Sequence, residues 1–300
     1  MNRLYFSTVN VIVLLSACLS YAGDSNLVNP YLLSYPFKSA VIHYGIKNEY
    51  GHGKTSTGTE VVYIKGDNLA KVTKMTVPDL KNRGKTKNTE TLQISDPDYL
   101  YNIDLVKKTG TKIDNPRKYT MPAYDKLSYE EKKAFYGRMS KRGIISLNLV
   151  SLGKKTGTDT VLGRQCDVYE SGEKLTPEKL REAVENGENP IYMKSWVWRT
   201  AVILKVIMSG FGWSNEMVAT KIEENVKIPD SQFTVPSDIK VAYDEEKSEF
   251  AKKEALASFE IYRTGKPMVV KVKLKKEEIK PNKEDSKTTV SNQKSQENQR

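Results

Sequence analysis

The sequence predicts a mainly β fold of the α+β class, an antiparallel sheet that carries a few helices. Apolar and polar residues alternate with a period of two from Ala40 to Lys47, as in a half-buried strand. Tight-turn signals such as Gly66-Asp67-Asn68 separate short runs rich in β-branched and aromatic residues. This strand–turn–strand spacing is typical of an antiparallel meander.

The strands follow one another along most of the chain. A glycine-rich turn is expected between the first two strands, at 48–58, and two further hairpin turns at 107–111 and 154–158, where Lys-Lys-Thr-Gly-Thr occurs twice. We expect strands at 40–47, 59–65, 69–77, 91–95, 99–106, 191–199, 201–208, 217–226, 231–235 and 268–274.

Two helices have clear start signals. Ser128 and Glu131 form a capping box that opens a helix through about Lys141. Thr176 as N-cap, followed by Pro177, opens a second helix that ends near residues 186–187. A charged segment at 245–258 has the composition of a third helix.

The first 22 residues have the pattern of a signal peptide. Arg3 precedes an apolar run from Val9 to Leu19, and Ser20-Tyr21-Ala22 provides small residues for cleavage. The run is shorter than the about 20 residues that a membrane-spanning helix needs, and the alternative is a buried N-terminal helix. We therefore expect a signal peptide at 1–22, a β-rich domain at 23–274 and a disordered charged tail at 275–300.

Cys18 leaves the processing of this export signal open. Leu15-Ser16-Ala17-Cys18 resembles the bacterial lipobox, in which the cysteine is lipidated, whereas ordinary cleavage would follow Ala22. The protein is then expected in the periplasm, or anchored to a membrane if Cys18 is lipidated. Cys166 would be the single cysteine of the mature chain, which rules out an intramolecular disulfide.

The chain is basic, with 48 Lys and Arg against 37 Asp and Glu and a net charge of +11. For an exported protein, an anionic membrane surface is a better partner for this charge than nucleic acid. A well-solvated charged surface is the simpler alternative. Two groups of basic residues stand out, namely Lys81, Arg83, Lys85 and Lys87, and Lys132, Lys133, Arg138, Lys141 and Arg142.

No catalytic or metal-binding signature occurs in the sequence, and we expect no cofactor and no enzymatic activity. The chain has two histidines and lacks His-x-x-x-His, Cys-x-x-Cys and Gly-x-Ser-x-Gly. Cys166 could act as a nucleophile, but a lone cysteine in a strand is more often a small buried apolar residue.

One segment, 194–208, has bulky apolar residues at every second position. These positions are Trp196, Trp198, Thr200, Val202, Leu204, Val206 and Met208. They form either the inner face of an ordinary β core or the wall of a pocket for an apolar ligand. The candidate cavity residues are Trp196, Trp198, Val202, Leu204, Ile42 and Tyr44.

The order of several motifs is similar to that of exported bacterial proteins related to the LolA and LolB lipoprotein carriers. The motifs lie at about residues 35–240 and include 39–44, 61–64, 161–169, 196–199, 216–223 and 231–236. The resemblance implies an incomplete antiparallel barrel, a curved sheet wrapped over short helices around an apolar cavity. In the carriers this cavity holds lipoprotein acyl chains. No functional residue of that family can be aligned with a residue of this chain.

Three functions remain open. The first is a non-enzymatic carrier of the cell envelope that binds lipid or lipoprotein acyl chains. The second is a structural or interaction module whose sheet core is filled by its own side chains and whose basic surface binds another envelope component. The third, a hydrolase that uses carboxylates or Cys166, has no supporting motif.

Overall fold

A computed structural model describes residues 27, 29–32, 35–79, 82, 84–141, 153–188, 190–199 and 202–266. The chain divides into two compact units, 1–267 and 268–300, and every described residue belongs to the first. The predicted signal peptide with Cys18, the strand expected at 268–274 and the charged tail lie outside the described residues.

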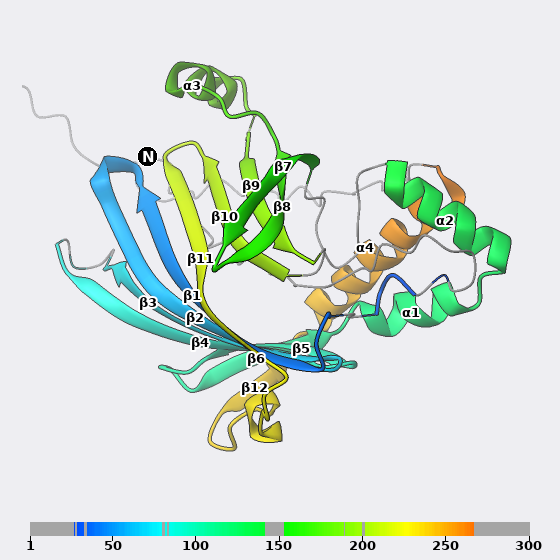
Figure 1. Cartoon of the computed structure of the whole chain (residues 1–300). Coiled ribbons are helices and arrows are strands. Elements are labelled where there is room, and N and C mark those ends of the chain that lie inside the picture. The colour runs from blue at the N-terminus through cyan, green and yellow to red at the C-terminus, as the bar shows by residue number, and fades with distance from the viewer. Residues whose placement is uncertain are drawn as a thin grey trace, which may run out of the picture. The chain divides into compact units, whose positions relative to one another are not determined.

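Twelve strands form a single curved sheet (Figure 1). Its order is β12-β6-β5-β4-β3-β2-β1-β11-β10-β9-β8-β7, and every pair is antiparallel except β12 with β6. The strands are β1 (Ser39–Tyr50), β2 (Lys54–Lys65), β3 (Asn68–Pro78), β4 (Thr86–Ser95), β5 (Tyr99–Asp104), β6 (Thr109–Asp114), β7 (Lys154–Val161), β8 (Arg164–Ser171), β9 (Tyr192–Trp198), β10 (Val202–Gly210), β11 (Trp213–Glu224) and β12 (Lys240–Tyr243). The predicted fold class, a curved antiparallel sheet with a few helices, is confirmed.

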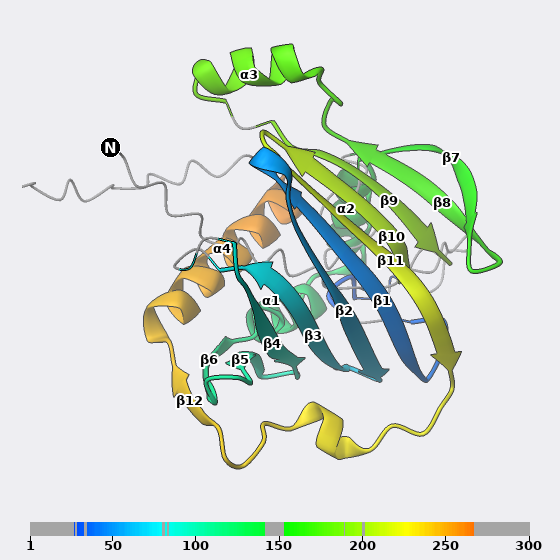
Figure 2. The ribbon, with the colours of Figure 1, turned by 90° about the vertical axis from the view of Figure 1, so that its left-hand side faces the viewer.

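Three of the four α-helices lie on one side of the sheet, which we call the inner side (Figures 1 and 2). They are α1 (Arg117–Asp125), α2 (Tyr129–Lys141) and α4 (Glu245–Thr264), while α3 (Pro177–Glu185) is inserted between β8 and β9. Across the described part of the chain, no helix combines the length and the hydropathy needed to cross a membrane.

The β1–β2 hairpin is longer than predicted. The chain turns only at the 3-10 helix η1 (Gly51–Gly53), so most of the glycine-rich segment 48–58 is strand. Gly58 lies inside β2, where a Cβ atom would come within 2.2 Å of the Lys74 carbonyl oxygen and the Met75 sulfur. This glycine allows a close approach of β3 and does not mark a turn.

The turns expected at the two Lys-Lys-Thr-Gly-Thr segments are found only in part, because Lys107 and Lys108 lie in the β5–β6 turn and the second segment lies in a strand. Gly110 lies within β6 and Gly157 within β7. The β7–β8 turn instead uses Leu162 and Gly163, both with positive φ (50° and 70°), which is the conformation of a tight two-residue hairpin turn. Segment 107–111 therefore begins in a turn and continues into β6, whereas segment 154–158 lies within β7 and forms no turn.

The helix start signals were read correctly, but one helix was missed. The Ser128–Glu131 capping box forms both reciprocal hydrogen bonds, and Thr176 caps α3. The missed helix is α1, which has no capping side chain and contains Pro122. The strand expected at 231–235 is wrong, because the 3-10 helix η2 (Asp230–Phe233) occupies that position.

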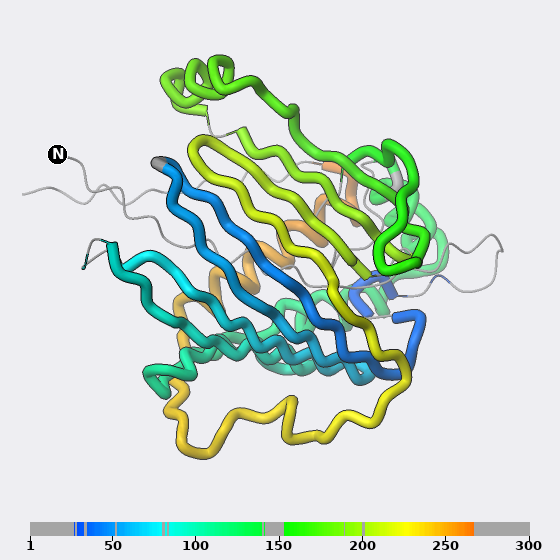
Figure 3. Tube along the Cα trace, turned by 60° about the vertical axis from the view of Figure 1, so that its left-hand side comes forward, coloured from blue at the N-terminus to red at the C-terminus, as the bar shows by residue number. Residues whose placement is uncertain are grey.

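The sheet changes its buried face between β2 and β3. In β1 and β2, Ile42, Tyr44, Val62 and Ile64 share the inner face by register and are buried. Leu69 at the start of β3 is still buried on the inner face, but the other buried apolar residues from β3 to β6, which are Ala70, Leu92, Ile94 and Ile103, share the opposite, outer face. The segment after β11 passes along this outer face to β12 and packs Phe233, Val235, Ile239 and Val241 against it (Figure 3).

Candidate functional site

The candidate site is the apolar inner face of β1, β2, β10 and β11. Side chains from these four strands are placed on one face because residues directly opposite in an antiparallel pair share a face. They are Ala40, Ile42, Tyr44, Val62, Ile64, Val206, Met217 and Ala219, each at most 8% exposed. Such a surface suits an acyl chain, which needs apolar contact and few polar groups.

All six predicted cavity residues belong to one buried cluster, but they do not share a face. Trp196 is paired with Lys205, and Lys205 with Val218, which faces Gly45 in β1. Tyr44, one residue before Gly45, therefore points to the other face, as does Ile42. Register thus places Trp196, Trp198 and Val202 on the outer face and separates them from Ile42 and Tyr44.

The single apolar parity expected for 194–208 is wrong. The chain turns after Trp198, with Arg199 at a φ of 49°, and enters a separate strand. A register shift between Ile203 and Lys205 then leaves Leu204 as an extra residue in β10. Val206 consequently faces Ser195 and lies on the face opposite to Trp196.

Basic side chains cover both tryptophans on the outer face. The Lys194 and Lys205 ammonium groups lie 5.4 and 5.0 Å from the Trp196 ring centre, and Arg164 and Arg199 lie 4.8 and 4.7 Å from the Trp198 ring centre. At these distances a cation is attracted to the face of an indole ring.

Asp159 completes this cover. The indole N–H of Trp196 donates a hydrogen bond of 2.8 Å to its carboxylate. This bond, followed by the backbone N–H of Thr160, lowers the pKa of Asp159. Both tryptophans are only 6% exposed, so their rings serve the packing of the outer layer.

The inner face also holds a buried polar cluster. The Glu60 carboxylate accepts a hydrogen bond from Thr73 (2.8 Å) and lies 3.4 Å from the Lys71 ammonium, with the two charged side chains 8% and 15% exposed. The Tyr44 hydroxyl donates to the carbonyl of Ile203 at 2.9 Å. Burial, and then the negative charge of Glu60, raise the pKa of Tyr44 well above its usual value.

Sequence reasoning missed Glu60 and Lys71, although the alternation contained a signal for them. Glu60 stands at the parity of Val62 and Ile64, and Lys71 at the parity of Leu69, so both occupy positions expected to face the core. A charged residue at a core parity predicts a buried partner.

Ser195 adds another polar atom to the inner face. It is paired with Val206 and is fully buried, and its hydroxyl has no hydrogen-bond partner among the described residues. A buried hydroxyl without a partner carries a desolvation cost.

The helices on the inner side form a hydrophobic cluster of their own. Its buried members are Tyr31, Tyr124, Phe135, Met139, Phe259 and Tyr262, and none of them belongs to the sheet cluster. Aromatic rings contact one another edge-on or tilted, as in the Tyr124–Phe135 pair at 5.3 Å.

Part of the basic group predicted on α2 serves this helical cluster. The Arg138 guanidinium donates hydrogen bonds to the carbonyls of Tyr262 and Arg263 at the end of α4. Lys132 donates to the carbonyl of Asp125 at 3.3 Å. In the other group, Lys85 and Lys87 are exposed.

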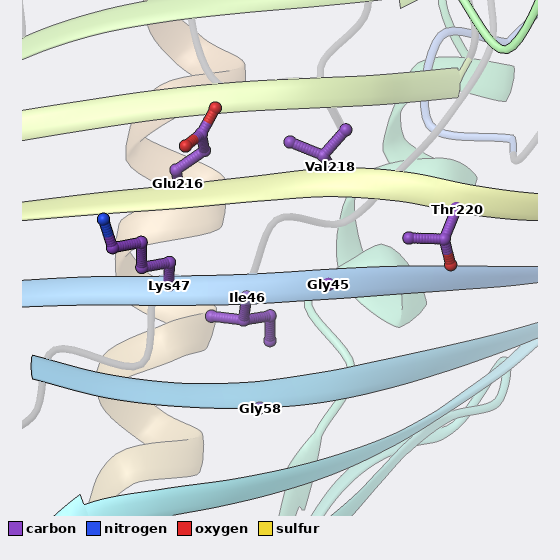
Figure 4. A pocket seen from close by; sticks show the side chains of 7 residues that line it. All are labelled: Gly45, Ile46, Lys47, Gly58, Glu216, Val218 and Thr220. Carbon is purple, nitrogen blue, oxygen red and sulfur yellow. The ribbon is translucent and has the colours of Figure 1, made fainter.

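A shallow hollow of about 280 Å³ lies on the outer face (Figure 4). It is lined by Gly45, Ile46, Lys47, Gly58, Glu216, Val218 and Thr220. The hollow includes the position of Gly45, which offers no side chain to fill it. Glu216 at its edge pairs with Lys205 at 3.0 Å. It is not continuous with the inner apolar face, because the sheet lies between them.

The described residues offer little for catalysis. Cys166 is buried within the sheet cluster, its thiol donates to the carbonyl of Arg164 at 3.4 Å, and burial raises its pKa. This is the environment of a structural cysteine and not of an activated thiolate. In the described ranges, no three His, Cys, Asp or Glu side chains come together as a metal site.

The fold and the inner face together define an open, curved antiparallel sheet with an apolar side beneath helices. No family model and no curated protein matches the sequence. Solved structures do resemble it. The LolA superfamily protein NE2245 from Nitrosomonas europaea has a TM-score of 0.28 at 10% identity, with 69% of this chain and 94% of that one covered.

Two further solved structures carry related names. The lipoprotein LppX from Mycobacterium tuberculosis has a TM-score of 0.27 at 11% identity, covering 65% of this chain and 91% of that one. A putative outer membrane lipoprotein-sorting protein domain from Vibrio parahaemolyticus has a TM-score of 0.28 at 11% identity, covering 65% and 89%. These three structures carry the names of the group of proteins that the motif order resembles. With each TM-score below 0.5, the likeness extends to no residue of a site.

Proposed function

We propose that this protein is an exported, non-enzymatic carrier of the cell envelope that binds an apolar ligand, a lipid or a lipoprotein acyl chain, on the inner face of its sheet. One observation carries the proposal. The apolar inner face of β1, β2, β10 and β11 and the aromatic cluster of α1, α2 and α4 occupy the same side of the sheet as separate clusters.

Separate clusters are what ligand exchange requires. Each cluster keeps its own interior contacts, so the helices can shift relative to the sheet without disrupting the packing inside either cluster. An acyl chain entering between them gains about 0.8 kcal/mol for each buried CH₂ group. A sheet whose helices interlocked with it would lose core packing at every exchange.

Export and membrane contact complete the proposal. The signal peptide at 1–22 would bring the carrier to the periplasm, or to a membrane if Cys18 is lipidated. Exposed lysines such as Lys85 and Lys87 support an encounter with anionic head groups, each worth about 1 kcal/mol close to a membrane.

The test measures binding of a fluorescent fatty acid to the purified mature protein, with mass spectrometry of co-purified lipid. Val62 on the inner face and Val61 on the outer face are neighbours in β2 and form a matched pair for Val→Thr replacement. A hydroxyl placed against an acyl chain without a partner costs about 1–3 kcal/mol. We expect Val62→Thr to weaken binding at least fivefold and Val61→Thr to leave it unchanged.

Fluorophore binding is compared at equal folded fraction, established by thermal melting. Absence of both co-purified lipid and fatty-acid binding in the natural sequence would favour the alternative, a structural module with a filled core. Equal losses in the two valine variants would show that the acyl chain does not use the inner face.

A further inference from the structure

Arg117, the first residue of α1, is a buried cation without a buried counterion. The residue is buried, with 7% of its surface exposed. Among the described residues, its guanidinium makes one long hydrogen bond, from Nη2 to the carbonyl of Asp67 at 3.5 Å. No described carboxylate lies within 4.0 Å of it, although a guanidinium carries five N–H donors in a rigid fork.

The site connects to the inner apolar face through Tyr35. Tyr35 packs against the sheet cluster and stacks on Phe37 at 5.5 Å; burial raises the pKa of its hydroxyl, and the positive charge of Arg117 partly offsets this rise. Tyr35 and Glu60 in turn both act on Tyr44. The cationic group of α1 therefore lies within electrostatic reach of the buried polar residues beside the acyl surface.

Two carboxylates act on Arg117, but neither forms a contact ion pair with it. Lys71 and Glu60 neutralise each other on the inner face at 3.4 Å. Asp67 and Asp96 attract Arg117 only from beyond contact distance, and burial lowers its pKa despite them. A buried cation ordinarily has a paired anion, because desolvation of an unpaired charge is costly.

We propose that Arg117 binds the anionic head group, a carboxylate or a phosphate, of the ligand whose acyl chain lies on the inner face. This inference rests on the proposed carrier function and specifies its ligand as an anionic amphiphile. The planar fork matches the two oxygens of a carboxylate or phosphate. The head group would supply the counterion that Arg117 lacks.

The experiment compares ligands with one chain and different head groups. Hexadecanoate, hexadecyl phosphate and hexadecanol are titrated into the full mature protein at pH 8, competing with a fluorescent fatty acid. We expect both anions to bind about 10- to 100-fold more tightly than the alcohol, the range of a charge-assisted hydrogen bond. Equal affinities for all three would overturn the head-group site and leave the carrier function intact.

Variants then assign the preference to Arg117. Arg117→Gln keeps most of the side-chain volume and should remove the preference for anions while leaving hexadecanol affinity unchanged. Arg117→Lys should retain part of it. The matched control is Lys118→Gln, the next residue of α1, which is 40% exposed and lies 3.6 Å from Asp114. A preference that survives Arg117→Gln, or that Lys118→Gln also removes, would overturn the assignment.

Two further outcomes matter. One distinguishes a free anion from a lipid head group, and the other distinguishes failure of the head-group site from failure of the carrier function. If inorganic phosphate alone raises the melting temperature as much as hexadecyl phosphate does, the site holds a free anion and the lipid assignment is overturned. If no amphiphile of the series binds, the carrier function itself fails. If Arg117→Gln does not fold, Arg117→Lys and the head-group series decide the question.

Discussion

The two halves of the sheet bury opposite faces, and the comparison shows that one strand pattern can be covered in two different ways. In β3–β6 the buried outer face is covered by residues 233–241 of the same chain. In β1, β2, β10 and β11 the buried face is the inner one, where the helices keep a separate cluster. The segment that covers the first core is tied to β6 through β12, whereas the helices beside the second keep a separate cluster, which is the arrangement on which the proposed ligand exchange depends.

The largest expected effect compares Ile42 with Ile103, one from each core and both fully buried. We expect Ile42→Ala and Ile103→Ala each to lower the free energy of unfolding by about 2–5 kcal/mol, because each leaves a cavity. Urea denaturation measures this loss. Only Ile42→Ala should also change fatty-acid affinity at equal folded fraction, and a comparable change in Ile103→Ala would erase the distinction between the halves.

An intermediate effect is expected from two ion pairs on opposite faces of β3. Lys71 pairs with buried Glu60 on the inner face, and Lys74 pairs with Glu90 on the outer face at 2.9 Å, where their side chains are 62% and 36% exposed. Glu60→Gln should cost about 2–3 kcal/mol because it leaves Lys71 largely buried without its partner. Glu90→Gln should cost less than about 1 kcal/mol.

A double variant checks the cause of the larger loss. Lys71→Met in the Glu60→Gln background removes the stranded charge and should recover most of the stability in the same urea titration. If the double variant is as unstable as Glu60→Gln alone, the cost arises from Glu60 itself and not from the unpaired lysine.

The smallest effect concerns the outer layer over Trp196. The pKa of Asp159 is lowered by the Trp196 hydrogen bond, so its contribution to stability is present above the usual pKa of an aspartate, about 4, and is lost as pH falls through the lower folded value. We expect the tryptophan emission to change in that acid range. In Asp159→Asn the amide oxygen can still accept the bond, and the pH dependence should disappear. An unchanged titration in Asp159→Asn would assign it to another group.

Much of the fold could be predicted because it is encoded locally. Alternation identified most strands from β1 to β11, and the capping signals identified α2 and α3 through bonds between residues three apart. The wrongly predicted turns also arise from local signals. Gly58, Gly110 and Gly157 lie within strands, since a glycine allows close strand approach as readily as it allows a turn.

The candidate site was predicted only in part. Ile42 and Tyr44 lie on the inner apolar face and Trp196 on the outer one, and the single parity expected for 194–208 fails because one extra residue in β10 and the turn at Arg199 interrupt it. Arg117 could not be found from the sequence, because the groups that act on it, Asp67, Tyr35 and Asp96, are distant in the chain.

The sequence by itself determined a mainly β chain with alternating strands, two capped helices and an N-terminal export pattern, because each of these depends on neighbouring residues. The tertiary structure alone decided which face of each strand lies inside, that the buried face changes between β2 and β3, and that Arg117 is buried without a counterion. A period of two defines two faces of a strand, but only the packing of distant segments determines which face is covered and by what.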